Sequence, residues 1–364
     1  MSTSHERFMQ AAIAMASVTH GQTAPNPAVG CVIVKDGRIV GMGAHFKAGE
    51  PHAEVMALKQ AGDLAKGADV YVTLEPCAHF GKTPPCADTL VTHNVKRVFI
   101  ATTDPNPLVA GKGIEILKRN NISVEVGVCE EEAQRINRDF FFRMANKRPW
   151  ITLKSASTLD GKTATRTFDS KWITSTDSRE DGHLLRHHHQ AILVGLQTVI
   201  HDNPSLTCRL PGGGVHPIRF ILDTQLNIPK NSTVLHDGVV DTIIVCGANA
   251  SLEKEKELTK EQHVSIWRSK TERVELSWLV KEMAANNILS LLVEGGATVQ
   301  SSFVKENLFD EFHHYLAPKL IGGQDSHNMI ADLNVTMMKE AIELKVKEVK
   351  ILGPDVKLIL TRKD

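Results

Sequence analysis

The stretch TLEPCAHFGKTPPCADTL, residues 73–90, holds two Pro-Cys pairs, and the triplet His-Ala-Glu precedes it at residues 52–54. The imidazole of His52 and the thiolates of Cys77 and Cys86 form a three-ligand set for zinc. Such a set leaves the fourth tetrahedral position open, which is typical of catalytic rather than structural zinc sites. His52 and Cys86 stand where helices are predicted to begin, and the positive end of a helix dipole favours thiolate. The sequence therefore predicts one zinc ion in this chain.

Glu54 stands two residues after His52 and is the predicted catalytic residue. A carboxylate at this spacing can take a proton from a water on the zinc ion and return it to a leaving amine. Zinc deaminases use a Glu in this way, in the signature H-x-E followed by P-C-x-x-C. Here eight residues, AHFGKTPP, separate Cys77 from Cys86 in place of two. A structural zinc site with His79 as a fourth ligand, or a metal-free pair of buried cysteines, stays open at this point.

Around this motif the first half alternates between strands and helices. Residues 28–34 and 38–43 flank Asp36-Gly37 and predict a β-hairpin. An amphipathic helix is expected at the N-terminus, and Pro51 is expected in the first turn of a helix that runs to about residue 60. The other expected elements are strands at 70–73, 98–101 and 122–126 and helices at 86–93 and 129–145. This order predicts an α/β sandwich around a mostly parallel sheet.

The bulk composition limits the classes of function. The chain has 364 residues, of which 42% are apolar and 23% charged, so two globular domains are expected. Basic and acidic residues balance at 42 each, which argues against binding to nucleic acid through bulk charge. No segment is apolar for long enough to span a membrane, and no secretory signal is evident. Six cysteines are too few for a disulfide scaffold, so a cytoplasmic location is expected.

The pattern of elements restarts near residues 146–149, which predicts domains at 1–147 and 148–364. Strands are expected at 150–156, 191–195, 219–222, 242–246 and 288–293, with a helix at 177–189 and a charged, solvated helix at 253–262. Residues 344–352 and 356–361 predict a closing hairpin. The histidines 187–189 would point about 100° apart on a helix and cannot converge on one ion, so a solvated helix face is expected.

The segment LLVEGGATV, residues 291–299, predicts a buried strand that ends at Gly295-Gly296 before a helix. Bare backbone amides and a helix N-terminus at this point suit a phosphate group. A simple tight turn is the alternative. The G-x-G-x-x-G pattern is absent, so an ordinary Rossmann domain is not indicated.

These motifs together resemble one known family. Residues 73–90, the triplet 52–54 and APNPAVGCVIV at 24–34 resemble the deaminase domain of the bifunctional riboflavin-biosynthesis deaminase/reductases, where the longer cysteine spacing is the normal form. The second half is similar to the reductase domain of that family in LKSASTLDGKTA (153–164), SKWIT (170–174), LLR (184–186), TVIHDNPSLTCR (198–209), ILDTQL (221–226) and LLVEGGATV. The resemblance implies an N-terminal cytidine-deaminase-like α/β/α sandwich followed by a dihydrofolate-reductase-like α/β domain.

The resemblance also implies the reactions. The substrate would be a small molecule, a diaminopyrimidinone that carries a ribosylamino 5′-phosphate. After deamination, NADPH would transfer a hydride to C1′ of the ribosyl group and open it to a ribityl chain. A homo-oligomer is expected, with neither nucleic acid nor membrane as a partner. A second half that has lost activity and only docks is one alternative, and a nucleic-acid-binding zinc protein is another.

By the same resemblance, site residues carry over to this sequence. The deaminase would contact its substrate through Asn26, His45, His79 and Lys82. The reductase would contact its substrate through Lys154, Ser170, Arg186, Leu206, Arg209 and Glu294. The nicotinamide cofactor would contact Ala156, Trp172, Thr198, Asp202, Thr224, Gly296, Ala297, Thr298 and Val299. The two arginines suit a phosphate, Lys154 and Asp202 are candidate proton donors, and core packing is the alternative role of Trp172.

Overall fold

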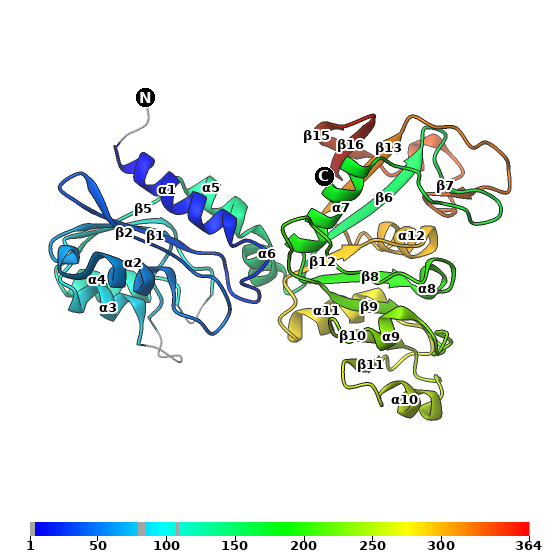
Figure 1. Ribbon diagram of the computed structural model, residues 1–364, viewed down its shortest axis with the longest axis horizontal. Helices are drawn as coiled ribbons and strands as arrows, with labels where there is room; N and C mark the ends of the chain where they lie inside the picture. The colour runs from blue at the N-terminus through cyan, green and yellow to red at the C-terminus, as the bar shows by residue number, and fades with distance from the viewer. Residues whose placement is uncertain (1–3, 79–83, 107–108, 364) are drawn as a thin grey trace. The chain divides into compact units, whose positions relative to one another are not determined.

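The computed structural model describes residues 4–78, 84–106 and 109–363 (Figure 1). The chain divides into two compact units, Met1–Lys147 and Arg148–Asp364. We call them the N-terminal unit and the C-terminal unit and describe each by itself. Within the described ranges, no helix has both the length and the apolar character that crossing a membrane requires.

The N-terminal unit contains a five-stranded sheet in the order β2-β1-β3-β4-β5. Its strands are β1 (Gly30–Lys35), β2 (Arg38–Ala44), β3 (Asp69–Leu74), β4 (Arg97–Thr102) and β5 (Ser123–Val126). Strand β1 is antiparallel to both β2 and β3, whereas β3, β4 and β5 are parallel. The predicted hairpin is confirmed, with positive φ at Asp36 and Gly37 as a tight two-residue turn requires. The expectation of a mostly parallel sheet was wrong, because β1 pairs antiparallel with both of its neighbours and two of the four strand pairs are therefore antiparallel.

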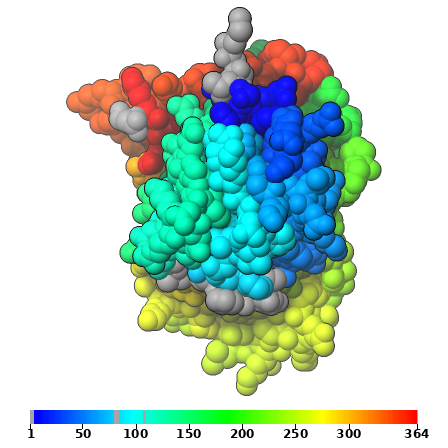
Figure 2. All heavy atoms as spheres, turned by 90° about the vertical axis from the view of Figure 1, so that its left-hand side faces the viewer, coloured from blue at the N-terminus to red at the C-terminus, as the bar shows by residue number. Residues whose placement is uncertain are grey.

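Helices cover both faces of this sheet. On one face α1 (Ser4–Val18) and α5 (Glu130–Ile136) pack with Val32, Tyr71 and Phe99. On the other face lie α2 (Ala53–Ala61), α3 (Cys86–Thr92) and α4 (Lys112–Arg119), with the short 3₁₀ helix η1 (Gly62–Ala65) after α2. Helix α2 comes earlier in the chain than α3 and α4, yet all three cover the same face of the sheet. Blue and cyan side chains therefore lie next to one another on the surface in Figure 2. The unit is therefore an α/β/α sandwich.

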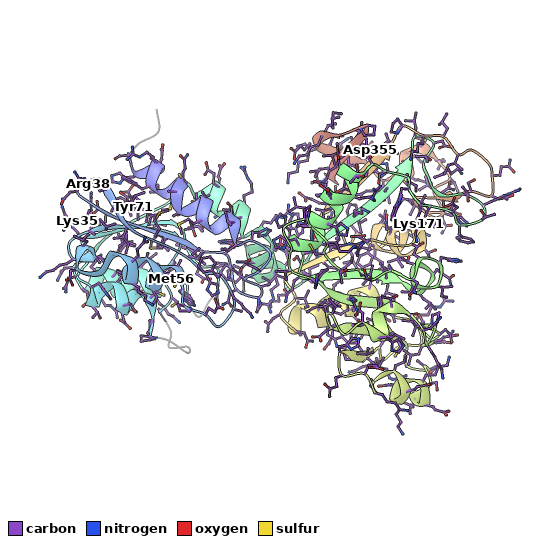
Figure 3. The ribbon with its side chains drawn as sticks, viewed as in Figure 1. Lys35, Arg38, Met56, Tyr71, Lys171 and Asp355 are labelled. Atoms are coloured by element: carbon purple, nitrogen blue, oxygen red, sulfur yellow. The ribbon has the colours of Figure 1, made fainter. Side chains whose placement is uncertain are left out.

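Tyr71 shows how the sheet holds α1 (Figure 3). Its ring is buried, stacks on Phe99 with centroids 4.7 Å apart, and its hydroxyl lies 2.8 Å from Nδ1 of His5. An aromatic residue in a central strand thus supplies apolar area below the helix and a polar contact at its start.

The single helix expected at 129–145 is instead two helices, α5 and α6 (Arg138–Asn146). Asn137 separates them, with φ −105° and ψ 24°. Its buried amide donates to the carbonyl of Ala28 at 2.8 Å and accepts from the amide of Ala28 at 2.7 Å. The interruption therefore joins the helices to the segment before β1, a long-range contact that helical periodicity does not reveal.

The C-terminal unit contains a nine-stranded sheet in the order β11-β10-β9-β8-β12-β6-β13-β16-β15. Its strands are β6 (Trp150–Thr158), β8 (Ala191–Gly195), β9 (Ile218–Leu222), β10 (Thr242–Cys246), β11 (Val264–Arg268), β12 (Ser290–Val293), β13 (Glu311–Ala317), β15 (Leu344–Leu352) and β16 (Asp355–Arg362). From β11 to β13 all neighbours are parallel, and β13, β16 and β15 pair antiparallel. The predicted closing hairpin is confirmed. A separate pair joins β7 (Lys162–Ala164) to β14 (His327–Asn328).

Helices flank this sheet on both faces as well. They are α7 (Thr176–His188), α8 (Leu196–Asp202), α9 (Thr233–His236), α10 (Leu252–Leu258), α11 (Leu276–Ala285) and α12 (Ala297–Lys305), with the 3₁₀ helix η2 (Met338–Glu340). One core cluster joins the sheet to α11 and α12, and another joins it to α8 and α9. Asp355, labelled in Figure 3, accepts from Ser175 N and Ser178 Oγ, both at 2.7 Å, and so fixes the start of α7 to the hairpin.

The histidines 187–189 at the end of α7 do not form the solvated face expected for them. His189 is buried, with Nδ1 2.7 Å from the carbonyl of Leu185 and Nε2 2.8 Å from Oγ1 of Thr152. Nδ1 of His187 accepts from the amide of Val215 at 3.0 Å. Both rings serve as polar links between the helix end and its neighbours.

Candidate active sites of the two units

The predicted zinc ligands come together in the N-terminal unit. Nδ1 of His52 lies 3.6 Å from Sγ of Cys77 and 3.3 Å from Sγ of Cys86, and all three ligand atoms lie within 4.8 Å of one another. Tetrahedral zinc with ordinary Zn–N and Zn–S bonds would separate such atoms by about 3.6 Å. The two distances from Nδ1 of His52 therefore fit a zinc ion bound by these three residues. Within the described ranges this donor set is also the one group of His, Cys, Asp and Glu that could hold a metal.

Local structure explains why these three residues meet. His52 is the N-cap of α2, Cys77 follows the end of β3, and Cys86 is the first residue of α3. The amide of Cys86 donates to Sγ of Cys77 at 3.3 Å. Pro51 precedes the N-cap, so its expected place inside the first turn was wrong by two positions. At the start of α3 a backbone amide points at the Cys77 sulfur, in agreement with the expected effect of a helix start.

Glu54 lies in the first turn of α2 and its side chain is only 3% exposed. Burial raises the pKa of this carboxyl to about 7, although the neighbouring His52 acts in the opposite direction. A carboxyl with such a pKa can both take up and release a proton near neutral pH, as acid–base catalysis requires.

Two of the expected deaminase substrate residues lie beside the ligands. Nδ2 of Asn26 is 3.1 Å from Nε2 of His45, and the His45 ring lies edge-on to that of His52 with centroids 5.3 Å apart. Nδ1 of His45 is 3.3 Å from the carbonyl of Pro51, so the pair suits a neutral ring that accepts from Asn26. Burial lowers the pKa of His45, which also favours the neutral ring. His79 and Lys82 lie outside the described residues.

Glu75 also shapes this site, and the sequence analysis missed it. Its buried carboxylate accepts backbone hydrogen bonds from Asp104 at 3.3 Å, Gly111 and Gly113 at 3.0 Å, and Ile114 at 3.3 Å. These contacts attach the start of α4 to the strand end that leads into Cys77. The available signal was an acidic residue inside an apolar strand, directly before Pro76-Cys77.

In the C-terminal unit a charged cluster gathers three of the expected reductase substrate residues. Glu294 follows β12 and pairs with both nitrogens of the Arg186 fork, at 2.7 and 2.8 Å. Nζ of Lys154 on β6 lies 4.0 Å from the same carboxylate. Burial would raise the pKa of Glu294, but Arg186 and Lys154 outweigh it and hold that pKa at about 2. Glu294 is therefore ionised throughout the neutral range.

The two arginines expected at a substrate phosphate differ in their contacts. Arg186 is occupied by Glu294 and by the carbonyl of Thr207, 3.0 Å from Nη1. Arg209 is exposed, and its Nη1 contacts the hydroxyls of Ser205 at 2.7 Å and Thr207 at 3.1 Å. Leu206, which stands between Ser205 and Thr207 in the sequence, is buried with φ +54°. Arg186 is thus paired with a carboxylate, whereas Arg209 contacts only neutral hydroxyls among the hydrogen bonds that the described residues show.

The glycine turn after β12 brings several expected cofactor residues together. A Cβ at Gly295 would lie 2.9 Å from Oγ1 of Thr198, and a Cβ at Gly195 would lie 2.8 Å from a methyl group of Val299. Gly296 is the N-cap of α12 with φ +70°, so the bare amides at the start of this helix are preserved. The strand, turn and helix predicted from residues 291–299 are thereby confirmed.

The remaining expected residues lie on other elements of the unit. Ala156 is half-buried on β6, Asp202 ends α8, and Thr224 follows β9. Ser170 and Trp172 lie on the segment between β7 and α7, and Trp172 is 63% exposed, so core packing is not its role. Cζ of Arg179 lies 4.6 Å from the centre of the Trp172 ring, and Nζ of Lys319 donates to its carbonyl at 2.7 Å.

Helix α7 contributes neighbours of the charged cluster that the sequence analysis missed. Burial, Arg186 and Arg209 lower the pKa of His183 to about 4, so its ring is neutral. The hydroxyl of Tyr315 and Nζ of Lys357 both contact Asp181 Oδ2, and the Tyr315 ring lies 5.5 Å from Nζ of Lys154. The spacing of His183 and Arg186 on one helix face was the available signal.

Comparisons with known proteins match both units of the chain. Residues 2–102 match the family model described as the cytidine and deoxycytidylate deaminase zinc-binding region, and residues 149–358 match that of the RibD C-terminal domain. The riboflavin biosynthesis protein RibD of Bacillus amyloliquefaciens is 49% identical over 359 residues, which cover 99% of this chain and 96% of the relative.

Two solved structures cover 99% of this chain and 99% of their own. RibD of Acinetobacter baumannii has a TM-score of 0.91 at 39% identity. A diaminohydroxyphosphoribosylaminopyrimidine deaminase/5-amino-6-(5-phosphoribosylamino)uracil reductase of Thermotoga maritima has a TM-score of 0.87 at 35% identity.

These findings confirm the predicted fold of both halves, a cytidine-deaminase zinc domain and then a dihydrofolate-reductase-like domain. The first half is a zinc-binding deaminase domain with its site at His52, Cys77 and Cys86, and the reductase half implies a nucleotide cofactor. The nucleic-acid-binding alternative is therefore wrong. With identity extending over nearly its whole length, the chain belongs to the RibD family, the bifunctional deaminase and reductase enzymes of riboflavin biosynthesis.

Proposed function

We propose that the N-terminal unit deaminates a diaminopyrimidinone that carries a ribosylamino 5′-phosphate, and that the C-terminal unit then reduces the ribosyl group to ribityl with NADPH. The observation that carries the proposal is the three-ligand set of His52, Cys77 and Cys86 with the buried Glu54 in the adjoining helix turn. The substrate itself is inferred from the activity that the name of the relative from Thermotoga maritima states.

One zinc ion per chain would be held by these three side chains. When bound there, zinc supplies Lewis acidity at its open fourth position and lowers the pKa of water. Glu54 would take the proton from that water on a carboxylate oxygen and deliver it to the departing amino group. Its side chain lies in the first turn of α2 and is 3% exposed, which favours proton transfer within the site over exchange with bulk water.

Asn26 and His45 would orient the pyrimidine. The amide of Asn26 can hydrogen-bond a base edge, and its contact with Nε2 of His45 fixes which way the amide group points. We also assign substrate contacts to His79 and Lys82, the latter to the phosphate, because both stand between the two cysteine ligands in the sequence.

In the C-terminal unit the cofactor would lie across the carboxyl ends of β8, β9 and β12, next to Thr198, Thr224 and the Gly295-Gly296 turn. The other cofactor contacts that we assign are Ala156, Trp172, Asp202, Ala297, Thr298 and Val299. When bound, NADPH supplies the hydride that C1′ of the ribosyl group accepts.

The charged cluster would hold the reductase substrate. Arg209 would bind the phosphate, while Glu294 and Lys154 would contact the sugar, with Ser170, Arg186 and Leu206 completing the surroundings. Opening the ring breaks the C1′–O4′ bond and requires a proton at O4′. Of the two candidate donors, Lys154 is the better placed, because it is fixed beside Glu294, whereas Asp202 is exposed at the end of α8.

The two activities are also proposed to follow the two units, with deamination in residues 1–147 and reduction in residues 148–364. A cytoplasmic location and a homo-oligomer remain expectations. All six cysteines are free, which suits a reducing compartment. Sedimentation of the purified chain would test the oligomer.

The test of the function supplies the purified chain with the phosphorylated pyrimidine and follows ammonia and NADPH in one reaction. Release of ammonia followed by oxidation of NADPH supports the proposal, and NADH in place of NADPH decides the cofactor preference. Ammonia without any NADPH oxidation would instead favour a second half that only docks.

A further inference from the structure

Phe168 has a backbone conformation that is unusual for a large side chain. Its φ is +64°, in the left-handed region that glycine enters freely and where the Cβ of other residues is crowded. Burial does not explain this conformation, because the side chain is 46% exposed. A strained residue persists where specific contacts hold it, and it directs attention to the surroundings.

Two imidazoles supply those contacts. The Phe168 ring stacks on His201 of α8 with centroids 4.0 Å and planes 9° apart, and on His327 of β14 with centroids 4.0 Å and planes 27° apart. Nε2 of His327 is buried and has no hydrogen-bond partner in the described part of the chain. The His327 ring is therefore held by its stacking on Phe168. One ring therefore connects α8, β14 and the segment after β7.

That segment, residues 165–172, is compact within itself. The amide of Thr165 donates to the carbonyl of Asp169 and the amide of Phe168 to the carbonyl of Thr165, both at 3.0 Å. The amide of Lys171, which marks the segment in Figure 3, donates to Oδ1 of Asp169 at 3.3 Å. Because the turn is tied internally, the place of the Phe168 ring determines where the next residues lie.

Ser170 and Trp172 are those residues. On the other side of the segment Trp172 is attached by Lys319 and Arg179. The stack of Phe168 on His201 attaches the segment to α8, the helix that also carries Thr198 and Asp202.

We propose that Phe168 is a positioning residue of the reductase, and that its ring, held between His201 and His327, keeps Ser170 and Trp172 in place for the nucleotide cofactor and the substrate. The inference rests on the proposed function, in which those two residues make these contacts. Without the ring, the segment would occupy this place for only part of the time. The apparent affinity for NADPH then falls in proportion to the fraction of time for which the segment is in place, whereas turnover at saturating NADPH is unchanged.

The experiment compares Phe168→Gly, Phe168→Tyr and the control Val239→Ala in the full chain. Glycine removes the ring and relieves the backbone, tyrosine keeps the ring, and Val239 is an exposed apolar residue between α9 and β10. We expect Phe168→Gly to raise the KM for NADPH about tenfold, the loss expected for two aromatic contacts, with kcat within about twofold. Phe168→Tyr and Val239→Ala should match the parent chain, and ammonia release should be unchanged in all three.

Hydrogen exchange of residues 165–172 without cofactor gives a second readout that does not depend on reductase activity. The segment should exchange about tenfold faster in Phe168→Gly than in the parent chain or in Phe168→Tyr. An unchanged KM in Phe168→Gly overturns the inference, as does an equal loss in the Gly and Tyr variants. If the parent chain fails to oxidise NADPH, the proposed reductase function fails, and unchanged exchange in Phe168→Gly would separately refute the role of the stack.

Discussion

Replacement of Glu294 by Gln tests whether the charged cluster of the C-terminal unit is held by its buried carboxylate. The side chain of Glu294 is 8% exposed and is bonded to Nε and Nη2 of Arg186, with Nζ of Lys154 4.0 Å away. Glutamine keeps the shape but loses the charge and offers the fork a single acceptor. The positively charged guanidinium of Arg186 would then lie half-buried without a negatively charged group in contact with it.

The magnitude follows from the pKa of Glu294, about 2 in the folded chain against an ordinary value of 4.5. A depressed carboxyl pKa contributes stability above the unfolded value, and the contribution is lost as pH falls through the folded value. The contribution of the ionised Glu294 to the free energy of unfolding amounts to about 3 kcal/mol at pH 7 and roughly 1 kcal/mol at pH 3. The variant also leaves Arg186 uncompensated, so a total loss of about 3–5 kcal/mol is expected at neutral pH.

Thermal unfolding of the parent chain and of Glu294→Gln at the two pH values measures this difference. For a unit of this size the neutral-pH loss corresponds to a transition lowered by about 10 °C. The gap in the free energy of unfolding should narrow by about 2 kcal/mol between pH 7 and pH 3, because the parent chain loses its ionised carboxylate. A gap that is constant over this range, or absent at pH 7, would refute the stabilising role of this ion pair.

Two further predictions concern the zinc site and the two units. Glu54→Gln should retain zinc but lose deamination by several orders of magnitude, whereas Cys86→Ser should lose zinc and destabilise the N-terminal unit, since metal binding contributes to folding. Metal analysis together with an assay of ammonia release checks both variants. Loss of zinc from Glu54→Gln would show that the ligand assignment is wrong. A chain that begins at Lys147 should fold and oxidise NADPH with the deaminated substrate, while residues 1–147 should bind zinc and release ammonia only, because the compact units divide at this point. A folded C-terminal fragment that does not bind NADPH would contradict the reductase assignment.

Motifs with a strict chemical requirement were predictable from the sequence. His52, Cys77 and Cys86 are identified by residue type and spacing, and the structure places their ligand atoms together. The Asp36-Gly37 turn fixes its hairpin through local backbone preference alone. In both cases the determinants lie close together in the sequence or belong to residue types with few alternative roles.

Features that depend on distant contacts were not predictable. Strand β13 lies in the interior of the second sheet between β6 and β16, yet its sequence EFHHYLA carries polar residues that alternation does not explain. Its His314 is satisfied by Ser155 of β6, 2.7 Å away. In the same way Asn137 divides a predicted helix because it pairs with Ala28, and His189 is buried with its Nε2 2.8 Å from Oγ1 of Thr152. Each polar residue looks like a surface residue until its partner is known.

The reductase site shows the same limit. The resemblance names Arg186 and Glu294 individually, but it does not show that they pair with each other, whereas Arg209 contacts the hydroxyls of Ser205 and Thr207. Phe168 was missed because a phenylalanine in a polar loop gives no local sign of positive φ or of two histidine partners far along the chain.

Chelation of the metal tests the central claim, two separate chemistries in one chain, most directly. Ammonia and NADPH are followed together after zinc has been removed, first with the aminated substrate and then with the deaminated product of the first step. Because the zinc ligands all belong to the N-terminal unit, we expect ammonia release to stop and zinc to restore it, while NADPH oxidation with the deaminated compound continues at the original rate. Ammonia release that survives complete removal of zinc, or reduction of the deaminated compound that stops with it, would contradict the account.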